Sequence, residues 1–342
     1  MKKIKIVLLL LIILLGINII YAKDGDSRFL PLPIFGSTPE TGFIFGGAGL
    51  YLQDKTDGQF LMSAGAMYTE NEQTNVFLKI DNEFKNYSVL GQINYQNWVS
   101  KYYGVGNNTR LEDEEIFTRK NYSITLEFSR KLKKNKSAGI IGSYENYKIN
   151  VYKIDPNLTG NRGVALLGLG ITFSLDTRDR KLNTKTEHYF NYKLLEYFSS
   201  RNNNKFLKNH IDYRYFYNIY KEHTLGVHAI FDNNFGEIPF QKMVSLGNAY
   251  NMRGFLEGRY IDKNKAAVQM EYRFPVFKWF SGVIFTGFGE VYDKTFKLDE
   301  LKNSYGAGLR FNYDKEKGIT IRFDMAFNGE DSRVYVNFRE AF

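Results

Sequence analysis

Cysteine is absent from this chain of 342 residues, and proline, histidine and tryptophan are rare, at 6, 4 and 2 residues. Without cysteine, no disulfide can form and no lipid can be attached through a thiol. Two of the histidines, His223 and His228, are close in sequence, but their odd spacing puts them on opposite faces of a strand. The sequence therefore predicts no metal site.

Catalytic motifs are lacking as well. The chain has no Gly-x-Ser-x-Gly sequence, which marks the nucleophile of many hydrolases. Asp176, Arg178 and Asp179 could suggest acid–base chemistry, but such a group of charges is more typical of a solvated turn. We therefore expect a protein that is not an enzyme and that holds no cofactor.

Long apolar runs are missing beyond the first 22 residues, so no segment there reaches the roughly 20 residues of a membrane-spanning helix. At the start of the chain, three lysines precede an apolar stretch from Ile6 to Ile20 and a small residue, Ala22. This arrangement predicts a signal peptide at 1–22, followed by one domain at 23–342.

The net charge of +9 falls to +6 when the three lysines of the leader are subtracted. The basic residues alternate with apolar ones or lie in turns, and they form no single stripe, so nucleic acid is not an expected partner. A modest positive surplus favours anionic lipid headgroups at the rims of a membrane protein.

Aromatic residues are abundant, with 25 Tyr and 29 Phe, and apolar and polar residues alternate from about residue 41 onward. In one segment, single intervening residues separate the apolar Ile319, Ile321, Phe323 and Met325. Alternation with period two places one face of a strand against lipid and the other against water. The sequence predicts an all-β fold, a 16-stranded antiparallel transmembrane β-barrel of the bacterial outer membrane.

The predicted strands follow the alternating segments between Gly, Asn, Asp and Lys turns. They are 28–36, 41–52, 58–69, 73–83, 86–97, 116–130, 137–152, 163–177, 186–199, 205–220, 223–234, 265–275, 281–292, 303–314, 318–328 and 331–341. Most of the long connections follow odd-numbered strands, which is the pattern of a barrel with both termini on one side.

The longest of these connections contains Arg253, Gly254 and Phe255 in a glycine-rich polar stretch, and we expect it to fold back into the barrel. Glycine permits the positive φ of a tight turn, so a turn at Gly254 would direct the side chains of Arg253 and Phe255. An arginine inside a barrel needs acceptors, because an unpaired buried charge costs several kcal/mol.

The strand after the loop offers such an acceptor. Gln269, Glu271 and Arg273 share the luminal face of 265–275, so the sequence predicts an ion pair between Arg253 and Glu271 that pins the loop to the wall. Two interpretations stay open, one in which Arg253 only braces the loop and one in which it takes a direct part in transport.

The first and last strands would close the barrel. Pro31 and Pro33 have no N–H group and lie two residues apart, so both missing donors face the same side. If that side faces the last strand, the junction between 28–36 and 331–341 is a weak lateral seam. The alternative is that the first segment lies outside the barrel as a plain edge. The last strand would contribute to the seam one alternating set of residues, Val334, Val336, Phe338 and Phe342.

Several short motifs together resemble the BamA and TamA type of outer-membrane insertase and translocator superfamily, also known for its surface-antigen barrel. The similarity is greatest to the barrel of patatin-like autotransporters. The motifs are Pro39-Glu40-Thr41-Gly42, Tyr103-Gly104-Val105-Gly106-Asn107, Asp176-Thr177-Arg178-Asp179, Ile238-Pro239-Phe240, Leu246-Gly247, Met252-Arg253-Gly254-Phe255, Gly258-Arg259-Tyr260, Gln269-Met270-Glu271-Tyr272-Arg273-Phe274-Pro275 and Glu340-Ala341-Phe342.

The resemblance implies a second acid for the loop arginine in the next strand, but Gly287 stands at that position here. Glu290 is near in sequence, but its side chain would face the opposite side of the strand, so we do not expect it to replace the missing acid. The superfamily also implies polypeptide-transport-associated (POTRA) domains before the barrel. None fits in this sequence, so a partner in the periplasm would have to capture the client.

The leading hypothesis is that a lateral seam, in a barrel stabilised by the Arg-Gly-Phe loop, inserts or translocates client polypeptide, or handles lipid. The resemblance also implies the lateral gate. A second hypothesis is a passive or plugged pore, or a scaffold without transport activity. A membrane enzyme is the third.

Overall fold

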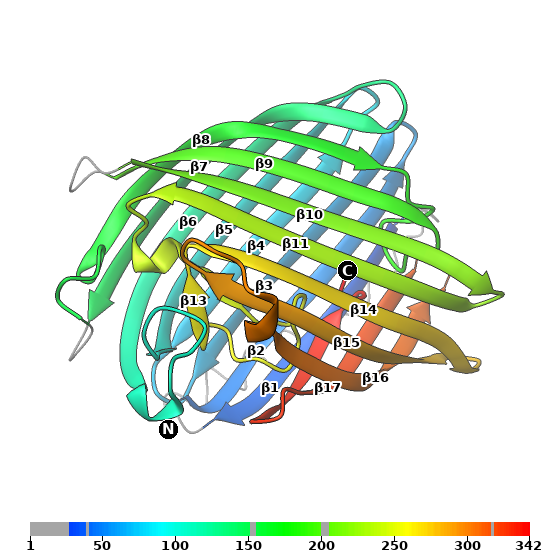
Figure 1. Cartoon of the computed structure of the whole chain (residues 1–342). Coiled ribbons are helices and arrows are strands. Elements are labelled where there is room, and N and C mark those ends of the chain that lie inside the picture. Colours follow the sequence, from blue (N-terminus) through cyan, green and yellow to red (C-terminus); the bar gives the residue numbers. More distant parts are fainter. Residues whose placement is uncertain (1–26, 39–40, 151–154, 200–204, 316–317) are drawn as a thin grey trace, which may run out of the picture.

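A single curled sheet dominates the computed structural model, which describes residues 27–38, 41–150, 155–199, 205–315 and 318–342. The predicted signal peptide lies outside these ranges. Sixteen strands form one antiparallel sheet that winds into a barrel (Figure 1). Each strand pairs with its neighbours in the chain, except that β11 pairs with β14, because β12 and β13 form a small sheet of their own.

The strands of the large sheet are β1 (Ser27–Thr38), β2 (Gly42–Lys55), β3 (Gly58–Thr69), β4 (Thr74–Glu83), β5 (Tyr87–Tyr102), β6 (Glu115–Lys131), β7 (Lys136–Asn150), β8 (Gly163–Asp176), β9 (Glu187–Ser199), β10 (Lys205–Tyr220), β11 (His223–Gly236), β14 (Asn264–Phe277), β15 (Phe280–Tyr292), β16 (Lys302–Asp314), β17 (Ile319–Phe327) and β18 (Ser332–Phe338). The segments between them contain β12 (Val244–Leu246), β13 (Tyr260–Asp262) and the 3₁₀ turns η1 (Leu111–Asp113), η2 (Phe240–Lys242) and η3 (Leu298–Glu300).

The predicted fold class is confirmed, and each predicted strand corresponds to one strand of the sheet. Alternation separates the two faces as expected. On β6, Leu126 and Phe128 are exposed on the outer face at 61% and 47%, whereas Ser129 on the inner face is 3% exposed. Among the described residues, no helix is long and apolar enough to cross a membrane.

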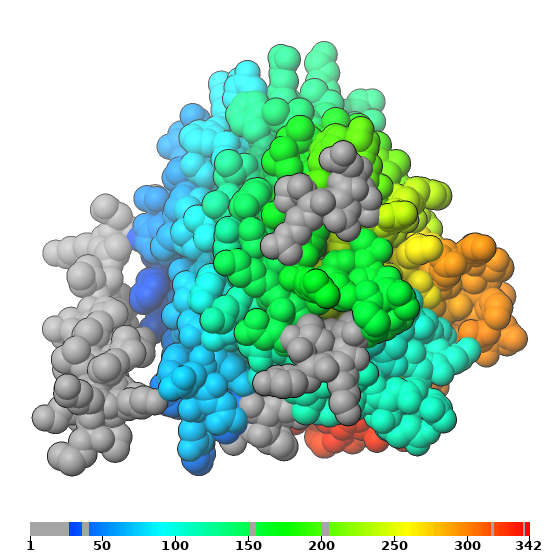
Figure 2. Space-filling model, turned by 90° about the vertical axis from the view of Figure 1, so that its left-hand side faces the viewer, coloured from blue at the N-terminus to red at the C-terminus, as the bar shows by residue number. Residues whose placement is uncertain are grey.

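The sheet is a meander, so sequence neighbours are also spatial neighbours. The outer surface in Figure 2 accordingly runs in adjacent bands from blue through cyan to green. The tight turns 221–222 and 278–279 lie at one end of the barrel, which we call the short-turn end. The long connections 103–114, 237–263 and 293–301 lie at the other, the long-loop end.

Two differences from the predicted strands concern the edges of the sheet. β1 pairs with β2 along its whole length, from Ser27 to Thr38, so the alternative that this segment lies outside the barrel is wrong. The last strand ends at Phe338, three residues earlier than predicted, because Arg339 adopts a positive φ of 67° that breaks the extended conformation. Within the described residues, β1 and β18 are the two edges, and no hydrogen-bonded ladder joins them.

Close strand spacing at the first hairpins leads to a testable prediction. A Cβ atom on Gly46 of β2 would lie 2.2 Å from the Ala66 carbonyl oxygen, whereas one on Gly91 of β5 would meet its nearest atom, in Leu126, at 3.6 Å. We expect Gly46→Ala to lower the free energy of unfolding by about 1–3 kcal/mol, since backbone must shift. Gly91→Ala is the matched control. Urea titration of the purified protein in lipid vesicles measures the unfolding midpoint of each variant. Equal midpoints for Gly46→Ala and Gly91→Ala would contradict the close approach of β2 and β3 at Gly46.

Candidate functional site

The connection between β11 and β14 folds back into the lumen, as Figure 1 shows for the yellow segment that includes β13. Apolar side chains hold it there. Leu246 and Met252 are fully buried, and they pack with Phe255, Tyr260 and residues of the wall. The predicted inward position of this loop is therefore confirmed.

A tight turn at Gly254 aims the neighbouring side chains in different directions. Gly254 has a φ of 112°, and its N–H donates to the Tyr335 hydroxyl at 3.0 Å. A Cβ atom at this position would lie 3.1 Å from the Phe327 carbonyl oxygen, so the close approach to β17 also favours glycine. The turn directs Phe255 into the apolar cluster and Arg253 into a polar one.

Arg253 is completely buried and has two carboxylate partners. Its Nη2 lies 2.7 Å from Glu271 Oε2, and its Nη1 lies 2.7 Å from Asp324 Oδ2. Gln269 Oε1 accepts from the Arg253 backbone N–H at 3.2 Å and from Nε at 3.3 Å. The guanidinium carbon lies 3.6 Å from the centre of the Phe285 ring. The charge is therefore paired and enclosed from several sides.

The structure brings together Arg253 and Glu271, the pair expected from the sequence. It supplies the second acid from β17, as Asp324, rather than from the strand after Glu271. At Gly287 a Cβ atom would lie 2.9 Å from Gln269 Cγ and 3.0 Å from Met252 Sδ, so the place of the family's acid is filled by these two side chains. Glu290 instead accepts the backbone N–H of Lys297 at 2.8 Å.

A larger network of charges surrounds this pair. Its further members are at most 7% exposed and are Arg273, Arg310, Arg322 and Glu340. Arg273 lies 2.5 Å from Glu271. Arg310 bridges two acids, since it lies 2.5 Å from Asp324 and 2.6 Å from Glu340. Buried like charges repel strongly unless acids separate them, so the alternation of arginine and carboxylate is what stabilises the cluster. Arg322 and Asp324 are two residues apart, so alternation alone puts them on one face of β17, but their partners lie on other strands and in the loop.

Residues 340–342 turn into the barrel and correct the prediction for Phe342. It is 6% exposed, packs on Phe216, and its carbonyl oxygen accepts from Arg273 Nη2 at 3.0 Å. Phe342 is therefore not part of the seam, because the positive φ at Arg339 reverses its side of the sheet. The luminal residues Gln269 and Arg273 are 0% and 5% exposed, so they support the loop and the tail rather than lining open water.

A second arginine ties the inward loop to the β5–β6 connection. Arg259 Nη1 donates to Thr109 Oγ1 at 2.6 Å, and its guanidinium carbon lies 4.7 Å from the Tyr103 ring centre. Gly106 N–H donates to the Ile261 carbonyl oxygen at 2.8 Å. Burial and a hydrogen bond to Glu114 raise the pKa of Tyr103, whose hydroxyl stays a donor. The Tyr103–Asn107 motif therefore anchors the loop from the long-loop end.

Apart from Phe342, the predicted seam residues lie on the two edge strands. Pro31 and Pro33 are exposed on the outer face of β1, and Val334 and Val336 are exposed on β18 at 71% and 48%. The side chain of Phe338 lies outside the described part of the chain. At the short-turn end, side chains bridge the gap: Arg28 Nε lies 3.0 Å from Asp314 Oδ2 on β16. Leu30 packs there in a cluster that also contains Leu50, Leu52, Leu182 and Ile319.

Metal ligands are not grouped in the described ranges: no three His, Asp or Glu side chains lie together so that they could hold an ion. The polar chemistry of the lumen consists instead of ion pairs between carboxylates and basic side chains, with arginine around Arg253 and lysine at the middle strands. Such an arrangement can fix a loop and a wall relative to each other.

Replacing Arg253 tests this bracing. In Arg253→Met, Glu271 keeps Arg273, and Asp324 keeps Arg310 and Arg322, but each acid loses a charge-assisted hydrogen bond. We therefore expect the free energy of unfolding to fall by about 1–3 kcal/mol. Trypsin should also cleave the loop faster. The matched control is Arg110→Met, since Arg110 makes its ion pairs with Glu112 and Asp113 at the surface. If both variants unfold at the wild-type urea concentration, the bracing role is refuted.

Comparison with solved structures finds barrels of the same architecture. BamA from Haemophilus ducreyi lacking POTRA domains 1–3 aligns with 92% of this chain and 69% of its own, at 13% identity and a TM-score of 0.57. CdiB from Acinetobacter baumannii aligns with 91% of this chain at 11% identity and a TM-score of 0.56, and CdiB from Escherichia coli with 92% at 11% and 0.58. This chain spans only 59% and 62% of those two CdiB chains. At such identities the likeness shows the fold.

No curated protein matches the sequence. The family is shown by a match to the Omp85 superfamily domain over residues 55–339, which is most of the chain and includes the Arg253 loop, β14 and β17. Proteins of this superfamily are barrels of the bacterial outer membrane that generally insert or translocate polypeptide. This chain belongs to the Omp85 superfamily and is an outer-membrane β-barrel.

Proposed function

We propose that this protein inserts client polypeptide into the outer membrane, or passes it across, through the seam between β1 and β18. The Arg253 loop holds the β18 side of that seam in place. One observation carries the proposal: the sheet has two edges with no ladder between them in the described residues, and a buried ion-paired loop is fixed directly beside one edge. Capture of the client before it reaches the barrel belongs to a partner in the periplasm.

The backbone of β1 supports a weak seam. Its register with β2 continues without interruption through Pro31 and Pro33. An antiparallel ladder bonds through alternate residues, and proline cannot donate, so an unbroken ladder requires that both nitrogens point away from β2. The free edge of β1 therefore lacks two donors. In lipid, unsatisfied backbone groups cost several kcal/mol each, which favours exchange with an incoming strand.

The two sides of the seam are held differently. On the β18 side, Tyr335 accepts from the Gly254 N–H, and Asp324 on the neighbouring strand binds Arg253. On the β1 side, the contacts across the gap lie at the short-turn end, in the Arg28–Asp314 pair and the cluster around Leu30. We infer that β1 and β2 swing outward about this end while β18 stays fixed.

Burial supports bracing as the role of Arg253. A side chain with no exposed surface cannot contact a passing polypeptide unless its loop moves, and moving it would leave two acids without this partner. Because the loop remains attached, the client would pass at the seam rather than through the centre of the barrel.

A plugged pore or inert scaffold is the second candidate. The observation that favours it is the filling of the lumen by the inward loop and by residues 340–342. Handling of lipid at the same seam is a variant of the first candidate. An enzymatic role is not part of the proposal. The closer likeness to patatin-like autotransporter barrels stays a prediction.

Locking the seam tests the proposal, and the chain's lack of cysteine makes every introduced disulfide unique. Cysteine pairs would join β1, at positions 29–35, to β18, at positions 332–336. The matched control is Phe35→Cys with Phe45→Cys, which links β1 to β2 where they are already paired. After depletion of the wild-type protein, we expect the control to restore outer-membrane protein levels and the oxidised seam locks to fail until a reductant is added.

Two outcomes would refute transport through the seam. One is full restoration of outer-membrane proteins and surface lipids by an oxidised seam lock whose disulfide is verified by mass spectrometry. The other is an unchanged outer membrane after depletion. If depletion has no effect while single-channel recording detects steady conductance, the pore is the better account.

A further inference from the structure

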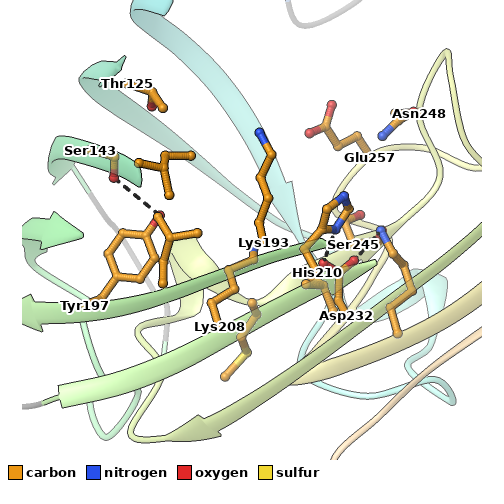
Figure 3. A pocket seen from close by; sticks show the side chains of 15 residues that line it. Thr125, Ser143, Lys193, Tyr197, Lys208, His210, Asp232, Ser245, Asn248 and Glu257 are labelled. Atoms are coloured by element: carbon orange, nitrogen blue, oxygen red, sulfur yellow. Dashed lines mark hydrogen bonds and ion pairs between the residues drawn. The ribbon is translucent and has the colours of Figure 1, made fainter. Parts of the chain in front are cut away.

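A cavity of about 410 Å³ remains in the lumen beside the inward loop (Figure 3). Its wall comes from strands β6, β7, β9, β10, β11 and β14, and the loop closes it with residues that include Ser245, Asn248 and Glu257. Lys193 and Lys208 stand on the wall strands, and Lys193 extends into the open middle of the view in Figure 3. The site is separate from the Arg253 cluster, which shares none of its lining residues.

Cations are prominent in this cavity, and their pairing is unequal. Lys193 lies 2.7 Å from Glu127 and Lys265 lies 3.1 Å from Asp232, which also binds His210 at 2.8 Å. Lys208 has no hydrogen bond or ion pair within the described residues. An ammonium group that is partly removed from water and forms no direct ion pair favours binding of an anion.

Another part of the same cavity is apolar. Ile141 and Leu195 of the wall, together with Met243 and Val244 of the loop, contribute to the lining. Ser143 and Tyr197 also line the cavity, and the Ser143 hydroxyl donates to the Tyr197 hydroxyl at 3.4 Å. The rest of the lining is polar or charged, so the cavity offers a small apolar surface beside charged groups. Its volume lies within the roughly 300–1,000 Å³ that is usual for sites of small organic molecules.

We propose that this cavity binds a small organic anion with an apolar body, whose carboxylate pairs with Lys208 while the body lies against Ile141, Leu195 and Met243. Neither the superfamily nor the seam requires such a ligand, so the site is independent of the proposed transport. Binding would also stabilise the inward loop, because the ligand bridges loop and wall.

Glu257 allows a second test of the proposal. It is exposed, it lines the cavity from the loop, and no ion pair is formed by it in the described part of the chain. Its carboxylate repels an anion bound at Lys208. Removing this charge should therefore strengthen binding, whereas removing the lysine should weaken it.

Fluorescence anisotropy of 2-naphthoate provides the test, with the full chain in phosphatidylcholine nanodiscs and empty nanodiscs as the blank. We expect saturable binding that weakens at least about tenfold in Lys208→Met, through loss of one charge-assisted hydrogen bond. Lys208→Arg should retain binding and Glu257→Gln should tighten it. Lys278→Met, which changes an exposed lysine in a turn outside the cavity, is the matched control.

Folding of each variant is checked by the heat-dependent mobility of barrels on gels, and Lys208→Arg shows that the position tolerates change. Equal affinity of wild type and Lys208→Met would overturn the proposal. So would equal affinity for the cation 2-naphthylmethylammonium, or no saturable signal above empty nanodiscs. The readout is binding alone, so failure of the transport proposal leaves this result interpretable.

Discussion

The enclosure of one guanidinium, that of Arg253, between Glu271 and Asp324 is the constraint on which the rest of the lumen depends. A charge without water must have partners, so β14 and β17 have to stand at a fixed separation with the loop between them. The further arginines extend this requirement to β16 and to Glu340. One half of the barrel is consequently held from inside by paired charges, and the tight turn at Gly254 delivers the arginine to them.

The first strands are stabilised by apolar packing rather than by buried ion pairs. Leu30, Leu50 and Leu52 are buried there in an apolar cluster, and Gly46 lets β2 and β3 approach closely. No buried arginine network crosses from the described part of these strands to the loop. The edge of β1 is further weakened by two prolines. The braced half and the lightly held half of the barrel meet at the edges β1 and β18, which form the seam of the proposed function.

Filling of the lumen is also uneven. The inward loop packs against β14 and β15, and Phe342 packs against Phe216 of β10. The middle strands retain a cavity that Lys208 lines, and this lysine forms no hydrogen bond or ion pair within the described residues. The same loop thus braces the sheet on one side and forms the boundary of a polar cavity on the other.

The sequence by itself determined the sixteen strands, their inner and outer faces and the inward loop, because pleating converts period two directly into two environments. The alternation of side chains along the strand after the loop also sufficed to propose the Arg253–Glu271 pair. Only the tertiary structure decided that Asp324, 71 residues from Arg253, is the second acid, that Phe342 turns inward and that Arg259 binds Thr109. Alternation says which side of a strand a residue occupies, whereas these contacts depend on how the sheet curves and how far each strand is shifted along its neighbour.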